Sequence, residues 1–119
     1  MSKIQDTVHE LHRLPGVKGA ALITNDGLVV ASSLDERFQG DVIAGLTSYL
    51  LMTTQRCLTE GGVGRATQYV LTATHGKTLI VGLEDSSLVI VLDQFADLAQ
   101  ARSEAQEAAQ RIRRASRIS

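Results

Sequence analysis

Apolar runs separated by short polar turns divide the chain into eight predicted secondary-structure elements. Three segments repeat apolar residues at the spacing of an α-helix, and five short runs rich in Val, Ile, Leu and Thr are typical of β-strands. The predicted helices span residues 2–14, 41–58 and 98–117, and the predicted strands span residues 19–24, 28–32, 65–74, 78–83 and 88–92. Tight turns between neighbouring strands favour an antiparallel sheet of the α+β class, with residues 41–58 as a helical crossover.

Four of the five predicted strands are apolar on both faces, which predicts that helices cover both sides of the sheet. The strand at 65–74 differs, because polar and apolar residues alternate along it. One of its sides carries Gln68, Val70 and Thr72. This alternation indicates an edge strand without a proline or bulge to blunt it, so we expect it to pair with a second chain. A solvated edge protected by Arg65 and Gln68 is the alternative.

The predicted central helix, residues 41–58, has two faces with few charges. Its more hydrophobic face is expected to lie on the core and carries Val42, Ile43, Leu46, Leu50 and Cys57. Its second face carries Ala44, Gly45, Ser48, Met52 and Gln55. A solvated face usually carries Lys and Glu, and a glycine inside a helix costs about 1 kcal/mol relative to alanine. We therefore expect another surface to approach the second face closely.

Local signals mark where the elements begin and end. Ser2 and Gln5 fit a capping box at the start of the first helix. Asn25-Asp26-Gly27 predicts a hairpin turn, because both Asp26 and Gly27 can adopt a positive φ. The glycines after Glu60 predict a left-handed C-cap for the central helix.

Composition limits the classes of function. A chain of 119 residues fits one domain spanning residues 1–119. The net charge of -1 gives no electrostatic reason to expect nucleic acid, and an aromatic content of 3% argues against base-stacking platforms. A lone cysteine excludes an intramolecular disulfide, and no window resembles a membrane span or an N-terminal leader. We therefore expect a cytoplasmic protein.

No motif predicts a catalytic, metal or cofactor site. The run 76–78, Gly-Lys-Thr, matches the end of a phosphate-binding loop, but Leu71 stands where that motif needs glycine and a strand follows. His9 and His12 lie one helical turn apart with no third ligand nearby and are expected to face solvent. Cys57 is expected to be buried and inert. We predict no metal, no cofactor and no enzymatic activity.

Two stretches carry a resemblance to a known family. Residues 14–32 read LPGVKGAALITNDGLVVAS and resemble the opening of the roadblock (dynein light chain) family, in which a helix ends before a hairpin closed by Asp-Gly. Residues 88–98 read LVIVLDQFADL and resemble the family's last strand and its entry to the final helix. Asp97 and Ala99 stand where the family usually has Asn and Gly. The bacterial, MglB-like branch is the one that the chain resembles.

The resemblance implies a profilin-like sandwich, in which a five-stranded antiparallel sheet lies between helices. It also implies a homodimer, joined edge to edge by the sheets and side by side by the central helices. The partner implied is a small Ras-like GTPase, which such proteins regulate without supplying an arginine finger. A scaffold in another signalling complex, for example beside a sensor kinase, is the alternative.

These expectations assign roles to particular residues. The expected homodimer interface consists of Asp41, Ala44, Gly45, Ser48, Met52, Gln55, Gln68, Val70 and Thr72. Tyr49 and Arg56 flank the second helix face and are expected to contact a third protein. The basic run at 111–117 is expected to stabilise the C-terminal end of the last helix, and an anionic partner or membrane surface is the alternative.

Overall fold

The computed structural model describes residues 2–36 and 38–118, and in these residues three helices and five strands follow one another in the predicted order. The helices are α1 (Lys3–His12), α2 (Gly40–Glu60) and α3 (Leu98–Ile118). The strands are β1 (Val17–Thr24), β2 (Val29–Leu34), β3 (Gln68–Ala73), β4 (Gly76–Gly82) and β5 (Ser86–Asp93). β3 is shorter than the predicted strand at 65–74, because residues 65–67 form part of the connection from α2.

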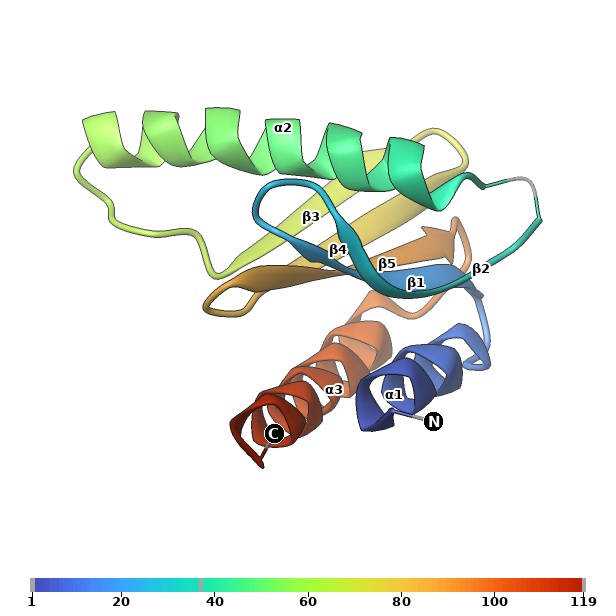
Figure 1. The fold of residues 1–119 in the computed structure, drawn as a ribbon. Helices are drawn as coiled ribbons and strands as arrows, with labels where there is room; N and C mark the ends of the chain where they lie inside the picture. The colour runs from blue at the N-terminus through green and yellow to red at the C-terminus, as the bar shows by residue number, and fades with distance from the viewer. Residues whose placement is uncertain (1, 37, 119) are drawn as a thin grey trace.

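The five strands form one antiparallel sheet in the order β2-β1-β5-β4-β3. α2 lies across one face of this sheet, and α1 and α3 lie side by side on the other (Figure 1). The predicted α+β sandwich with helices on both faces is therefore confirmed. β3 occupies one edge of the sheet, as predicted, and β2 occupies the other.

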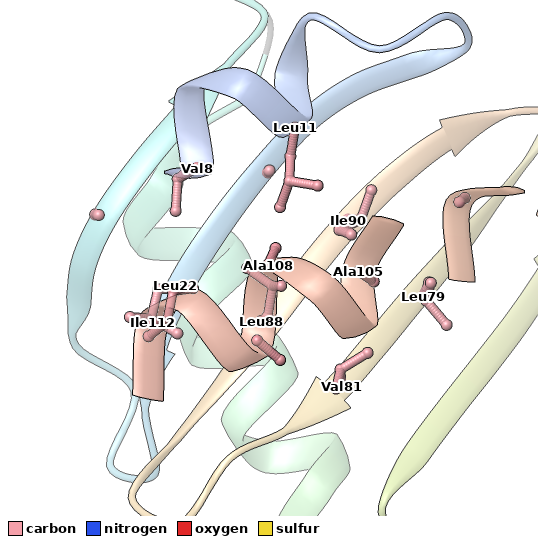
Figure 2. Packing of buried hydrophobic residues seen from close by; sticks show 14 of the residues in the cluster. Val8, Leu11, Leu22, Leu79, Val81, Leu88, Ile90, Ala105, Ala108 and Ile112 are labelled. Carbon is pink, nitrogen blue, oxygen red and sulfur yellow. The ribbon is translucent and has the colours of Figure 1, made fainter. Parts of the chain in front are cut away.

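Alternating residues of the strands fill two separate cores, because successive side chains of a strand point to opposite faces. The larger core lies under α1 and α3, and Figure 2 shows Val8, Leu11, Leu22, Leu79, Leu88, Ile90, Ala105, Ala108 and Ile112 within it. The smaller core lies under α2 and consists of Ala21, Ile23, Ala44, Ile80 and Val89. The inward alanines of α3 let this helix approach the sheet closely.

The caps and turns follow the local signals in part. The Ser2 hydroxyl accepts a hydrogen bond from the Gln5 amide N–H (3.0 Å), but the Gln5 side chain bonds the Ser32 carbonyl (3.0 Å) instead of closing the capping box. The predicted β1–β2 hairpin is present, and within its turn only Gly27 has a positive φ (88°). A three-residue loop closed by Thr24 and Leu28 needs only its last residue in that conformation.

The end of α2 matches its prediction. Gly62 adopts a φ of 70° immediately after the helix. The Val63 N–H donates to the Leu58 carbonyl (3.1 Å), and the Gly62 N–H donates to the Thr59 carbonyl (3.1 Å). These two bonds form a Schellman motif, which satisfies carbonyls that the helix end would otherwise leave without partners.

α2 is rotated about its axis relative to the predicted orientation. Ala44 and Thr47 are its buried residues, and Ile43, Leu50 and Leu51 are partly buried against the smaller core. Val42, Leu46 and Cys57 are exposed, although all three were predicted to face the core. The small Ala44 side chain allows the helix to lie close to the sheet, and the larger Val42 and Leu46 are left outward.

Candidate interaction surface on α2 and β3

The outward face of α2 carries a row of large apolar side chains. Val42, Leu46, Tyr49 and Met52 recur at the spacing of one helix face and have exposed fractions of 51%, 67%, 66% and 61%. We name these four residues the α2 stripe. Gly45 lies among them, and a Cβ atom built on it meets nothing within 4 Å. A contiguous apolar patch of this kind marks an interaction site more often than an exposed single side chain does.

Beside the α2 stripe lies a cleft of about 290 Å³ between the second half of α2 and the sheet. Leu51, Tyr69, Ile80 and Leu83 form its apolar lining, and Asn25, Ser48, Gln55, Arg65 and Ser87 add polar groups. We name it the α2–sheet cleft. Partial burial raises the pKa of the Tyr69 phenol above its ordinary value. The cleft and the α2 stripe share Met52, so they form one continuous surface.

The β3 edge continues this surface along the sheet. The Gly82 N–H donates to the Thr67 carbonyl (3.0 Å), which fixes the phase of the β3–β4 ladder. Because antiparallel residues alternate between facing their neighbour strand and facing away, the backbone groups of Gln68, Val70 and Thr72 point to the outer edge. These are the three β3 residues that the sequence placed at an interface.

The side chains of β3 divide between the two layers. Val70 packs against the larger core and Tyr69 against the smaller one. The Gln68 side chain accepts a hydrogen bond from the Gln106 amide of α3 (3.3 Å). Leu71 is 42% exposed. The strand is therefore anchored on both faces, and its outer backbone edge is held in a fixed position.

The structure divides the residues predicted for the α2 interface into exposed and buried ones. Asp41, Gly45 and Met52 are exposed, as are Tyr49 and Arg56, the residues predicted to contact a third protein. Ala44 is fully buried in the smaller core, so its assignment to an exposed interface was wrong. The error follows from the rotation of α2. For the same reason the sequence did not predict that Val42 and Leu46 are exposed. Apolar spacing alone does not show which apolar face of a helix lies on the core.

Two other predicted interface residues make bonds within the chain. The Ser48 hydroxyl donates to the Asn25 carbonyl (2.8 Å) and ties α2 to the β1–β2 turn. The Gln55 amide donates to the Gly64 carbonyl (3.1 Å), and its oxygen accepts from the Ala66 N–H (3.1 Å). These two hydrogen bonds join the Gln55 side chain of α2 to the connection between α2 and β3.

The polar groups outside this surface do not form a metal centre within the described residues. Residues 76–78 lie in β4, where a phosphate-binding loop would need a helix. The prediction that His12 faces solvent was wrong, because its side chain is partly buried against β2 and the residue after it. Its Nδ1 lies 2.7 Å from the Ser33 Oγ, and its Nε2 lies 2.8 Å from the Asp35 Oδ1. No helix in residues 2–36 and 38–118 is long and apolar enough to cross a membrane.

Comparison with protein families places the chain in a known family. Residues 3–93 match the Roadblock/LC7 domain. The chain belongs to the Roadblock/LC7 family. It is 31% identical over 104 residues to the uncharacterized protein MJ1340 of Methanocaldococcus jannaschii, which covers 87% of this chain and 91% of that protein. A second protein of the same organism, the uncharacterized protein MJ0714, is 31% identical over 112 residues, which cover 94% of this chain and 95% of that protein.

Solved structures agree with this assignment at the level of the fold. The chain is similar to Myxococcus xanthus MglB, with a TM-score of 0.89 and 15% identity over 94% of this chain and 93% of that chain. It is also similar to an MglB described with a tetrameric arrangement, with a TM-score of 0.85 and 23% identity over 95% of this chain and 87% of that one. At these identities the likenesses show a shared fold. The matched Roadblock/LC7 domain supports a regulatory or scaffolding role and indicates no enzymatic family.

Proposed function

We propose that two copies of this chain form a homodimer through β3 and α2, and that the dimer is a cytoplasmic, non-catalytic regulator or scaffold of a small Ras-like GTPase. The observation that carries the proposal is one continuous surface that joins the α2 stripe, the α2–sheet cleft and the outer edge of β3. Apolar side chains and an open strand edge are the two features that a second copy can cover together.

The ladder phase of β3 supports a particular register for strand pairing. If a twofold axis passes beside Val70, Gln68 of each copy faces Thr72 of the other, and all three outward residues pair within the strands. An axis at Tyr69 or Leu71 would instead place an outward residue opposite position 66 or 74, outside β3. The Val70 register also sets Tyr69 against Leu71 of the other copy, an aromatic–aliphatic pair of the kind that stabilises sheets.

Pairing at β3 would bring the two α2 helices together on the same face of a joined sheet. Each α2 crosses its own sheet with the α2–sheet cleft on the side of β3, so a neighbouring α2 can cover that cleft. Met52 lies at the margin shared by the cleft and the α2 stripe, where helix packing would bury it. Gly45 offers space for close approach of a second backbone.

We assign Tyr49 of the α2 stripe, together with Arg56, to the GTPase contact, and the rest of the stripe to the homodimer. Tyr49 and Arg56 are exposed on α2 and lie two helical turns apart. A large aromatic ring and an arginine are the side chains that most often dominate the energy of a protein interface. The family resemblance supplies the identity of the partner class, and the exposed pair supplies the residues to test.

The GTPase proposal is tested by binding measurements with the Ras-like GTPase encoded in the same genome, loaded with GDP or with a GTP analogue. We expect binding that depends on the nucleotide, and a loss of about tenfold or more in affinity for Tyr49→Ala and Arg56→Ala, as for interface hot spots. Gln110→Ala changes an exposed residue of α3 and is the matched control. A folded dimer that binds neither nucleotide form would contradict the proposal and favour a scaffold in another signalling complex.

A further inference from the structure

The second sheet edge, at β2, has the same kind of outward backbone groups as β3. The Asp35 N–H donates to the Lys18 carbonyl (3.2 Å), and Ser33 pairs with Ala20 two residues earlier in the ladder. By the alternation of an antiparallel ladder, Ser33 faces β1, and the backbone of Ser32 faces away from it. β2 would therefore be a second open edge if nothing else covered it.

Side chains of α1 reach across to this edge. α1 packs on β1 and β2 under the sheet, where Figure 2 shows Val8 and Leu11 turned into the larger core. Its neighbouring polar face turns to β2. The Gln5 Nε2 donates to the outward carbonyl of Ser32 (3.0 Å), so one group of the ladder edge already has a partner from the same chain.

Two histidines extend this contact along the strand. The His12 Nδ1 lies 2.7 Å from the Ser33 Oγ, and its Nε2 lies 2.8 Å from the Asp35 Oδ1. The His9 Nδ1 lies 3.3 Å from the same Ser33 Oγ. Gln5, His9 and His12 are spaced by four and three residues, so they lie on one face of α1. Together they contact Ser32 and Ser33 of β2 and Asp35, which follows the strand.

The β3 edge has a different kind of contact within the described part of the chain. There the hydrogen bond from α3 joins two side chains, Gln106 and Gln68, and does not involve the backbone of the strand. The two edges of the sheet are therefore unequal. A helix side chain occupies an outward backbone carbonyl at β2, and the outward backbone groups of β3 face away from both covering helices.

We propose that the polar face of α1 closes the β2 edge against pairing, and that removing Gln5 and His12 exposes a second assembly edge whose occupant is β2 of another copy. A second copy fits because a twofold axis beside β2 would place the β2 strands of two copies antiparallel to each other. The outward backbone groups of one strand would then face the same groups of the other. A protomer with both edges open would join at β2 as well as at β3, and assembly would continue as an open ribbon.

The test uses a background in which pairing at β3 is weakened. Thr72 is exposed and its N–H points outward, so Thr72→Pro blocks that edge without removing a bond to β4. At concentrations below the Kd of this background, we expect the chain with native α1 to sediment as a monomer. Adding Gln5→Ala and His12→Ala should produce a dimer, and Ser32→Pro, which places a proline at an outward position of β2, should return it to a monomer.

Controls separate edge pairing from general loss of structure. Asp6→Ala alters an exposed residue of α1 and should leave the monomer unchanged. Circular dichroism and cooperative urea unfolding establish that each variant is folded. If the double variant does not fold, Gln5→Glu alone opposes a carboxylate to the Ser32 carbonyl and should also produce the dimer. We name the chain with Gln5→Ala and His12→Ala the release variant. A folded release variant that stays monomeric in the Thr72→Pro background, or a dimer that persists with Ser32→Pro, would overturn the proposal.

This inference is distinguishable from the proposed homodimer at β3. With native β3, the release variant should form species larger than the dimer. If the unmodified chain is monomeric, the proposed function fails at β3, and the release variant should still form a dimer through β2.

Discussion

Tyr69 connects two parts of the candidate surface, the β3 edge and the α2–sheet cleft. It belongs to the edge strand β3, packs against the smaller core under α2, and lines the α2–sheet cleft. Partial burial disfavours the charged phenolate, and the pKa of Tyr69 is therefore raised in the folded chain. Its neutral hydroxyl is part of the surface that a second copy would cover.

The raised pKa predicts a dependence of stability on pH. In the unfolded chain this phenol titrates near 10.0, below its pKa in the folded chain. The contribution of the neutral phenol to the free energy of unfolding is therefore fully present below pH 10. This contribution is lost as the pH rises through the pKa of Tyr69 in the folded chain. Tyr69→Phe should reduce the fall in unfolding free energy between neutral and alkaline pH, as measured by urea unfolding. Tyr49→Phe, at an exposed ring, is the matched control, and a fall unchanged by Tyr69→Phe would contradict the prediction.

Among the elements, α2 combines a core helix with the proposed assembly surface. Its inner face needs only Ala44, Thr47 and partly buried neighbours to cover β1 and β2. Its outer face keeps the α2 stripe in solvent. Gly45 interrupts the row of large side chains, and a glycine there lowers the stability of the helix unless a partner makes use of the space.

Substitutions at Gly45 test whether a partner uses that space. Gly45→Glu should convert the dimer to a monomer, because bulk and charge would enter the helix contact. Gly45→Ala has room within the chain and should raise helix stability by about 1 kcal/mol when the dimer is dissociated. Sedimentation equilibrium and urea unfolding measure the two effects, with Gln110→Glu as the charge control on exposed α3. A Gly45→Glu variant that remains a stable dimer would place the contact elsewhere.

Predictability from the sequence also differs between elements. Strand and helix order followed from apolar periodicity and from turn residues such as Gly27 and Gly62, because those signals are local. The orientation of α2 did not follow, because both of its faces carry few charges and the pattern cannot choose between Ala44 and Val42 for the core. The contact of His12 with Ser33 and Asp35 joins residues more than 20 positions apart, and no local pattern encodes it.

For the whole molecule, the two edges of the sheet differ, because we propose that α1 closes β2 and that β3 pairs with a second copy. Gln5 bonds the backbone of β2, and β3 presents its outward groups beside the α2 stripe. The sequence predicted β3 as an edge strand because of its polar alternation, but gave no reason to expect α1 to protect β2. A molecule with one pairing edge can form a closed dimer and cannot extend further.

The central claim, a homodimer paired through β3, is tested most directly by sedimentation velocity on the unmodified chain and on Thr72→Pro. We expect the unmodified chain to be a dimer. Thr72→Pro should weaken it by about 2 kcal/mol or more, roughly 30-fold in Kd, because it removes two edge hydrogen bonds per dimer. Thr72→Ala keeps the N–H and should remain dimeric. A monomeric unmodified chain, or a Thr72→Pro variant that dimerises as tightly as the unmodified chain, would contradict the claim.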